Sequence, residues 1–176
     1  MNRIQPKHFC ILAIAPSTRG FGFAVLEGQE TLVDWGVKTV QGDKNGQSLA
    51  KVKKLIAHYQ PGTLVLEDAS AKNSRRSPRI RTLAQQIVKM AATLKVTAKL
   101  FSRDQVMKTL IADGQGTKHL LAEIMAKRFP EQLGLQVPPK RKPWMSEDSR
   151  MSIFDAVALA MVFQLKYTRR ISIFPS

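Results

Sequence analysis

The amino-acid sequence predicts the α/β class, with a mixed five-stranded sheet flanked by helices, from two observations. Three short apolar segments follow one another between residues 9 and 40 with brief links, as in an antiparallel meander. After residue 42, apolar segments of helix length and strand length alternate. The expected order of elements is βββαβαβααα, within a single domain spanning residues 1–176 that has short N- and C-terminal extensions.

Short apolar runs bounded by glycine and proline define the strands. They are expected at residues 9–15, 20–27, 31–40, 63–68 and 96–101. The fourth run is continuously apolar and ends in Glu67 and Asp68, which is typical of a buried central strand with carboxylates at its carboxyl end.

Apolar residues at helical spacing, together with caps and breakers, define the helices. They are expected at residues 47–59, 78–94, 102–112, 117–129 and 149–166, with Ser102 and Thr117 as N-caps. Residues 130–147 are rich in proline, lysine and arginine and are expected to form a loop.

Positive charge indicates the class of partner. Lys and Arg total 28 against 13 Asp and Glu, which gives a net charge of +15. Such an excess attracts polyanions, above all nucleic acid; the alternative is a ribosome- or membrane-associated protein, or a merely soluble basic one. The single cysteine, Cys10, excludes an internal disulfide and fits a reducing compartment. Because we see neither a signal peptide nor an apolar stretch of roughly 18 residues, we expect no membrane association and a cytoplasmic, nucleoid-associated protein.

Two acidic residues stand where catalytic carboxylates are worth seeking. Glu67 ends the predicted central strand, and Asp155 lies in an otherwise apolar final helix. Taken singly, Glu67 fits a solvated strand-end residue, and Asp155 fits a helix-start residue satisfied by backbone amides. Taken together on these two elements, they favour a metal site, because clustered carboxylates bind Mg²⁺ and two such ions can activate water against a phosphodiester.

Four segments in register along residues 9–165 resemble the RuvC family of Holliday-junction resolvases, within the RNase H-like nuclease superfamily. They are residues 11–22, which resemble the first hairpin of that family, residues 64–67 with 71–73, which resemble its second acidic strand, residues 105–118, which resemble its two-helix segment, and residues 155–160, which resemble its final acidic helix. The resemblance implies an RNase H-like fold and Mg²⁺-dependent cleavage of branched DNA such as Holliday junctions.

The resemblance also implies roles for single residues. Glu67 and Asp155 would be ligands of two Mg²⁺ ions, for which Mn²⁺ can substitute, and Ala15 stands at the position of the first catalytic aspartate. The family usually has another acid or a histidine three residues before the helical aspartate, where this chain has Ser152. Asp148 is the candidate to replace it as catalytic residue and metal ligand, provided that the helix starts later or bends.

Ala15 has two explanations. We favour an aspartate-to-alanine substitution introduced to hold DNA uncut. A natural alanine would instead mean a protein that binds without cleaving, or one that recruits another acid such as Asp68 or Asp148. With an introduced alanine, or with a natural alanine in a protein that only binds, the chain is expected to be inactive or severely impaired as a nuclease. A further departure from the family is Ser70, which replaces an aromatic residue that helps to disrupt base pairing at the junction.

Basic residues are concentrated beside the predicted site. Phosphate contacts are expected from Lys72, Arg75, Arg76, Arg79, Lys108, Lys118, Lys140 and Arg141. Cations at a helix N-terminus oppose the helix dipole. Local helix stability therefore does not explain the basic residues just before and at the start of the predicted helix at residues 78–94. By resemblance, Lys118 matches a family lysine that contacts DNA near the junction. Trp144 either stacks on a base or anchors its loop to the core.

The sequence therefore predicts a structure-specific endonuclease that acts on branched DNA by metal-ion catalysis and is silenced by Ala15. A homodimer contact is expected on residues 78–94, where Ile80, Leu83, Ile87 and Met90 form an apolar face. The same face could instead pack on the sheet. Two alternatives are a catalytically silent nucleic-acid-binding protein of the same fold and an RNA-processing nuclease.

Overall fold

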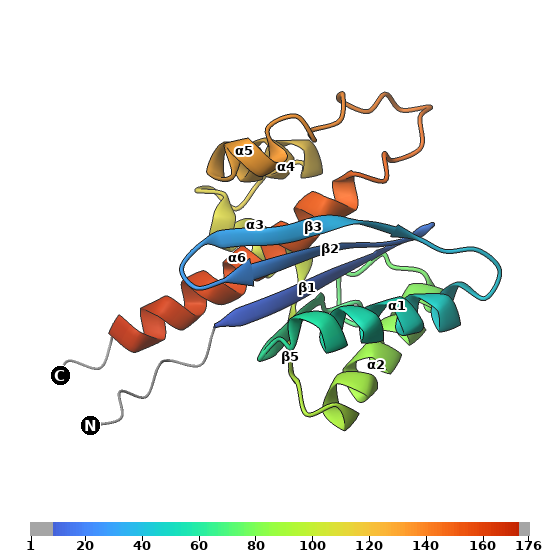
Figure 1. Cartoon of the computed structure of the whole chain (residues 1–176). Coiled ribbons are helices and arrows are strands. Elements are labelled where there is room, and N and C mark those ends of the chain that lie inside the picture. Colours follow the sequence, from blue (N-terminus) through green and yellow to red (C-terminus); the bar gives the residue numbers. More distant parts are fainter. Residues whose placement is uncertain (1–8, 173–176) are drawn as a thin grey trace, which may run out of the picture.

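Five strands form one mixed sheet at the centre of the molecule (Figure 1). The fold is described from a computed structural model for residues 9–172, and the predicted terminal extensions lie outside the described residues. The strands are β1 (Cys10–Ser17), β2 (Gly20–Glu27), β3 (Thr31–Thr39), β4 (Thr63–Glu67) and β5 (Thr97–Phe101), in the order β3-β2-β1-β4-β5. The first three form an antiparallel meander, and β4 and β5 are added parallel to β1.

Helices cover both faces of this sheet (Figure 1). One face carries α1 (Lys44–Tyr59) and α2 (Pro78–Thr93). The other face carries α3 (Arg103–Leu110), α4 (Lys118–Arg128), the short α5 (Pro130–Leu133) and the long α6 (Met151–Ser172). Ser102 and Thr117 cap α3 and α4 as predicted, because each side-chain oxygen accepts a hydrogen bond from a backbone N–H of the first turn.

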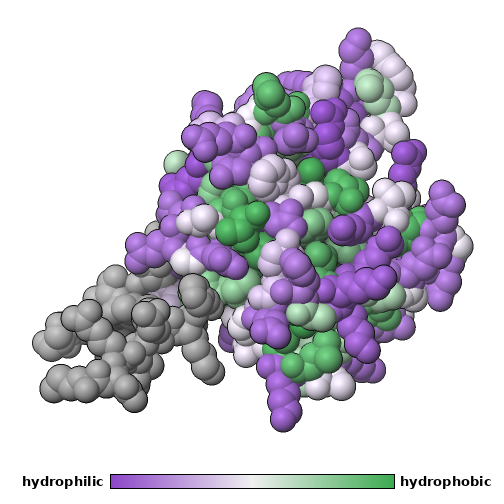
Figure 2. Space-filling model, in the orientation of Figure 1, coloured by the Kyte–Doolittle hydropathy of each residue, from purple (hydrophilic) through white to green (hydrophobic). Residues whose placement is uncertain are grey.

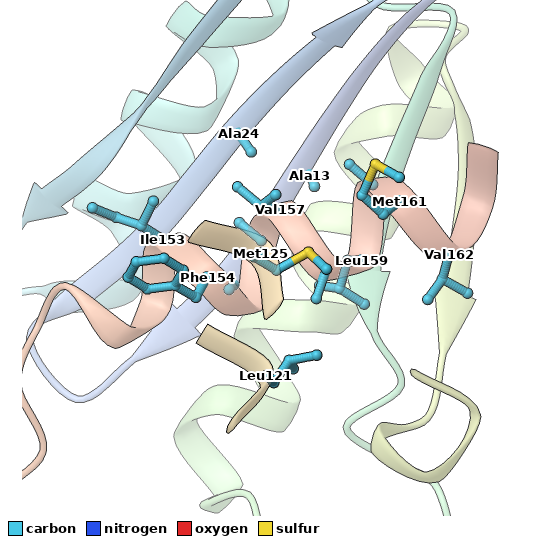
Figure 3. Packing of buried hydrophobic residues seen from close by; sticks show 14 of the residues in the cluster. Ala13, Ala24, Leu121, Met125, Ile153, Phe154, Val157, Leu159, Met161 and Val162 are labelled. Carbon is cyan, nitrogen blue, oxygen red and sulfur yellow. The ribbon is translucent and has the colours of Figure 1, made fainter. Parts of the chain in front are cut away.

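The sheet separates two apolar layers. Alternate residues of β1 point to opposite faces, so Ala13 and Ala15 enter the layer with α6, whereas Leu12 and Ile14 enter the layer with α1 and α2. Figure 3 shows the first layer, in which Val157 of α6 lies close to Ala13 of β1. Between Ile153 and Val162, α6 is apolar almost all round, which suits a helix buried between the sheet and α4.

At Gly22 of β2, α6 approaches the sheet so closely that no side chain fits. A Cβ atom placed there would lie 2.6 Å from Ser152 Oγ and closer still to the Ser152 carbonyl group. Gly22 pairs with Ala15 across β1 and β2, so the same contact sets the depth at which α6 crosses the end of β1. Asp155, one turn further along α6, is thereby brought over that strand end.

The predicted elements agree with the structure to within a few residues, with three differences. Helix α1 begins at Lys44 rather than at residue 47, because Asp43 caps it by accepting a hydrogen bond from Gly46 N–H. Residues 130–147 contain α5, which Pro130 starts at a position where its missing N–H is not needed. Helix α6 begins at Met151, two residues later than predicted, and ends at Ser172, six residues later than predicted.

The apolar face of α2 packs within the chain. Ile80, Leu83 and Ile87 are buried, the last two in the layer with α1, and Met90 packs against that layer. This confirms the alternative that the face covers the sheet, so its apolar residues no longer argue for a dimer contact, and a homodimer through this helix stays a prediction. The side of the molecule in Figure 2 is mostly hydrophilic, with hydrophobic residues in small separate patches. Within residues 9–172, no helix combines the length and the apolar character needed to cross a membrane.

Candidate functional site

Ala15 and Glu67 reach the same edge of the sheet on two neighbouring parallel strands. Ile14 of β1 pairs with Leu66 of β4, so the next residue of each strand lies at an equivalent position. Since side chains alternate along a strand, and Ile14 and Leu66 point toward α1 and α2, Ala15 and Glu67 point toward α6.

Asp155 reaches this place from α6. Its side chain is 20% exposed and lines a cavity of about 20 Å³ with Ala15, Glu67 and Arg76. The rest of the lining comes from Arg103, Val106, Met107, Leu121 and Leu159. The structure therefore brings together Ala15, Glu67 and Asp155, the residues that the family resemblance places at a catalytic centre.

The Glu67 carboxylate is paired with a cation from the loop that follows β4. Arg76 Nε donates a hydrogen bond to Glu67 Oε2, and both side chains are about four-fifths buried. Burial by itself would lower the pKa of Arg76, but the hydrogen bond and the negative charge of Glu67 raise that pKa above its ordinary value. The guanidinium of Arg76 is thus fixed at the floor of the site.

The Asp155 carboxylate faces a second cation, Lys118, at the start of α4. Lys118 Nζ lies 3.5 Å from Asp155 Oδ2 and 2.7 Å from Glu147 Oε1, a carboxylate oxygen of the segment before α6. Burial raises the pKa of Asp155, while the positive charges of Lys118 and Arg76 act in the opposite direction. Asp155 therefore depends on these two cations to carry its negative charge in a half-buried place.

Asp148, the predicted additional ligand, has a different partner. It precedes α6, and its carboxylate accepts hydrogen bonds from the backbone N–H and the guanidinium of Arg150 at 2.8–3.0 Å. The hydrogen bond from the Arg150 side chain holds the pKa of Asp148 below its ordinary value. Asp148 lines a cavity of about 180 Å³ that Asp155 also lines, but it is absent from the lining of the small cavity beside Ala15. Its role as a metal ligand stays a prediction.

These side chains do not fit the pair of magnesium ions expected from the sequence. Mg²⁺ takes several oxygen ligands and keeps some of its waters. A cavity of about 20 Å³ holds about one water, and its two carboxylates both face cationic side chains. Among residues 9–172, no group of three or more His, Cys, Asp or Glu side chains is placed to hold a metal ion. Binding of magnesium stays a prediction, and it requires a carboxylate at position 15 in place of the alanine.

A cationic cleft of about 670 Å³ opens beside the small cavity. Glu67 and Arg76 line both, and Lys72, Arg75, Arg103 and Lys118 line the cleft walls. Lys72, Arg75 and Arg103 are exposed, and within the described residues they make no ion pair or side-chain hydrogen bond. Two carboxylates, Asp68 and Asp104, also line this cleft. Its unpaired positive side chains are available to an anion, as expected for contacts with phosphate groups.

Arg79, another predicted phosphate contact, is hydrogen-bonded within the fold, and its contact with phosphate stays a prediction. Its guanidinium donates hydrogen bonds to the carbonyl oxygens of Ser17 and Thr18, in and just after β1, at 3.1 and 3.4 Å. It also donates to Asn45 Oδ1 of α1 at 3.1 Å. This side chain ties the start of α2 to the turn between β1 and β2, a structural role that the sequence pattern did not reveal.

The remaining predicted contacts lie outside the cleft. Lys108 is exposed on α3 and lines neither the cleft nor the small cavity. Lys140 and Arg141 line a separate cavity of about 320 Å³ beside the start of α4. Trp144 is 78% exposed and lies near Lys142 Nζ, so the expectation that it anchors the loop to the core is wrong. Stacking of Trp144 on a base stays a prediction.

Arg103 is a cleft residue that sequence reasoning missed. It directly follows the Ser102 cap, just beyond the end of β5. Glu67 of β4 pairs with Phe101 of β5, so Arg103 comes out at the same sheet edge as Glu67. The sequence did contain this signal, since a parallel β4–β5 pair places the residues after both strands together. Arg103 lines both the cleft and the cavity beside Ala15.

Comparisons with known proteins identify the fold. No protein-family model and no curated protein sequence matches the chain. Among solved structures, RuvC of Thermus thermophilus has a TM-score of 0.65 at 18% sequence identity, covering 92% of this chain and 96% of its own. The T. thermophilus RuvC complex with a Holliday junction substrate gives 0.64 at 19% identity over 88% and 92% of the two chains. The yeast mitochondrial Holliday junction resolvase Ydc2 gives 0.60 at 14% identity over 92% and 82%. The chain therefore has the RuvC-type, RNase H-like fold that its sequence predicts.

Proposed function

We propose that this protein binds branched DNA through the cationic cleft and, with Ala15 in place, holds the DNA without cutting it. The observation that carries the proposal is the cleft itself, where exposed Lys72, Arg75 and Arg103 stand unpaired around a floor that contains Glu67. Three unpaired cations lining one cleft favour a ligand with several negative charges, such as a nucleic-acid backbone, over a small neutral ligand.

Branched DNA is favoured over other polyanions by the fold. A structure of this fold, T. thermophilus RuvC, has been solved with a Holliday junction substrate, and the alignment spans 88% of this chain. The net charge of +15 supports binding of a long polyanion rather than a single phosphate. Arginine contacts to phosphate position a duplex without reading its sequence, so we expect recognition of shape rather than of bases.

The absence of cutting follows from the floor of the cleft. Cleavage of a phosphodiester needs an activated water and a stabilised leaving oxygen, which clustered carboxylates supply by holding metal ions. Here the methyl group of Ala15 offers no ligand, and Glu67 and Asp155 both face cations. The parent activity is then a metal-dependent endonuclease from which one carboxylate has been removed, or else a binding function that never included cleavage.

An Ala15→Asp variant separates these two origins. Cutting of a four-way junction in Mg²⁺ by the variant, and none by the original chain, supports a silenced endonuclease. Tight, salt-sensitive binding without cutting by the original chain, by Ala15→Asp and by Ala15→Asp combined with Arg76→Met supports a binding protein and rules out the nuclease interpretation. Ala15→Asn, which adds a side chain of the same size and shape without the carboxylate charge, is the matched control. Competition between RNA hairpins and DNA junctions tests the RNA-processing alternative.

A further inference from the structure

We propose that Arg76 and Lys118 serve as built-in counter-cations for Glu67 and Asp155, so that this site keeps its carboxylates and receives DNA without any divalent metal ion. The inference concerns the site of the proposed function. Its statement about DNA rests on that function, whereas its statement about metal ions does not. It starts from the mismatch between the side chains present and the two metal ions expected from the sequence.

The first counter-cation is Arg76. Its planar guanidinium donates to a Glu67 carboxylate oxygen, and the two side chains are 21% and 18% exposed. A charge-assisted hydrogen bond of this kind between half-buried groups is stronger than one at an exposed surface. One of the two Glu67 carboxylate oxygens, Oε2, is therefore already paired with a cationic side chain.

The second counter-cation is Lys118. It is the first residue of α4, and the Thr117 cap fixes the helix start from which its side chain extends. Lys118 Nζ lies between two carboxylates, 3.5 Å from Asp155 Oδ2 and 2.7 Å from Glu147 Oε1. One ammonium group thus joins α4, α6 and the segment before α6, at a place where a divalent ion would otherwise join carboxylates from separate elements.

The available space supports the same conclusion. The cavity between Ala15, Glu67, Arg76 and Asp155 has a volume of about 20 Å³, enough for about one water. A magnesium ion with part of its water shell does not fit between Glu67 and Asp155 in a cavity of this size. Removal of the positive charge from position 76 or 118 should therefore create both a need and a place for a divalent cation.

Charge balance explains why this arrangement suits DNA. An unpaired Glu67 and Asp155 would repel a phosphodiester approaching the cleft floor, and a divalent ion would be required to reverse that repulsion. Arg76 faces Glu67, and Lys118 is shared between Asp155 and Glu147, so these two cations offset two of the three carboxylate charges, and the exposed Lys72, Arg75 and Arg103 add positive charge around them. DNA affinity should then be the same with and without divalent ions.

The test compares thermal unfolding of the full chain in EDTA and in Mg²⁺ or Mn²⁺ at equal ionic strength. We expect no metal-dependent shift in the midpoint for the original chain. For Arg76→Met and Lys118→Met, we expect lower midpoints in EDTA and a recovery of about 3–6 °C when the metal reaches ten times its dissociation constant. Arg75→Met is the matched control, since it removes an exposed neighbouring charge without a partner, and its midpoint should not respond to metal. Arg76→Lys keeps the charge and should not respond either.

Two results would overturn the inference. One is a metal-dependent shift in the original chain, because its carboxylates would then accept a divalent ion despite Arg76 and Lys118. The other is the lack of a shift in both neutral variants, because the two side chains would then not stand in for metal. In a second measurement, the affinity of the original chain for a four-way junction should be equal in EDTA and in Mg²⁺. If no DNA binds under either condition, the proposed function fails, while the unfolding data still decide the role of the two cations.

Discussion

The main chain of Ser152 lies directly on Gly22, with no room between α6 and β2 for even a methyl group. Because Gly22 pairs with Ala15, this contact fixes how α6 crosses the sheet next to the position where the resemblance expects a catalytic aspartate. Asp155 follows Ser152 by three residues and reaches the cavity beside Ala15. A residue with no side chain thus positions one of the two carboxylates.

Gly22→Ala should therefore destabilise the protein. The added methyl group collides with the Ser152 backbone, which cannot move without shifting α6, and overpacking of this kind costs about 1–3 kcal/mol. Denaturant unfolding of the variant measures the loss. Gly62→Ala is the matched control, because a Cβ atom at Gly62 meets no atom within 4 Å. Equal stability of the two variants would contradict the close contact.

Arg79 should act mainly in stability and Arg75 mainly in DNA binding, although the sequence predicts the same role for both. Arg79→Met removes hydrogen bonds from a charged donor to the Ser17 and Thr18 carbonyl oxygens, which should lower the free energy of unfolding by about 1–3 kcal/mol. Arg75→Met should leave the unfolding free energy unchanged and weaken DNA binding. An Arg79→Met protein with an unchanged free energy of unfolding and weaker DNA binding would contradict this account.

The salt dependence of DNA binding should show whether the cationic cleft contacts the phosphates. Each phosphate contact contributes a slope of about −0.9 to the plot of log affinity against log salt concentration. The double variant Arg75→Gln, Arg103→Gln should therefore have a slope smaller by about 2. The double variant Lys53→Gln, Lys54→Gln removes the same charge from the exposed side of α1, on the other face of the sheet, and should change the slope little. Equal slopes for the two variants would exclude the cleft as the phosphate site.

Cys10 should make the protein sensitive to alkali. Burial raises the pKa of its thiol from 9.0 to about 11, so the unfolded chain loses this proton at lower pH than the folded chain. The contribution is fully present below pH 9 and is lost as the pH rises toward 11, by about 2–3 kcal/mol. Cys10→Ala should flatten this part of the stability profile. The pKa of Tyr59, raised to about 12 mainly by burial and by its hydrogen bond to Asp34, adds a further loss above pH 10 that the variant retains.

The positions of the strands and the two carboxylates could be predicted because they depend on local patterns and on sheet topology. Glu67 ends a continuously apolar run and Asp155 interrupts an apolar helix, and the family resemblance placed both beside position 15. Burial of Cys10 follows from the same apolar pattern and is confirmed at 6% exposure.

The partners of the long side chains could not be predicted. Arg76 and Arg79 stand three residues apart in one basic segment, yet one pairs with Glu67 and the other with carbonyl oxygens of a distant turn. Arginine and lysine side chains reach far enough that their partners are set by tertiary placement rather than by spacing in the sequence. The sequence therefore could not separate the basic residues that line the cleft from those that are hydrogen-bonded within the fold, and Arg103 was overlooked.

Binding without cutting is the central claim, and one measurement tests it most directly. A labelled four-way junction and a linear duplex of the same sequence are titrated with the original chain in EDTA and in Mg²⁺ at equal ionic strength, and the recovered strands are sized afterwards. The account predicts affinity for the junction at least about tenfold above that for the duplex, equal values in both buffers and intact strands throughout. Equal affinity for junction and duplex, or cleaved strands in Mg²⁺, would contradict it.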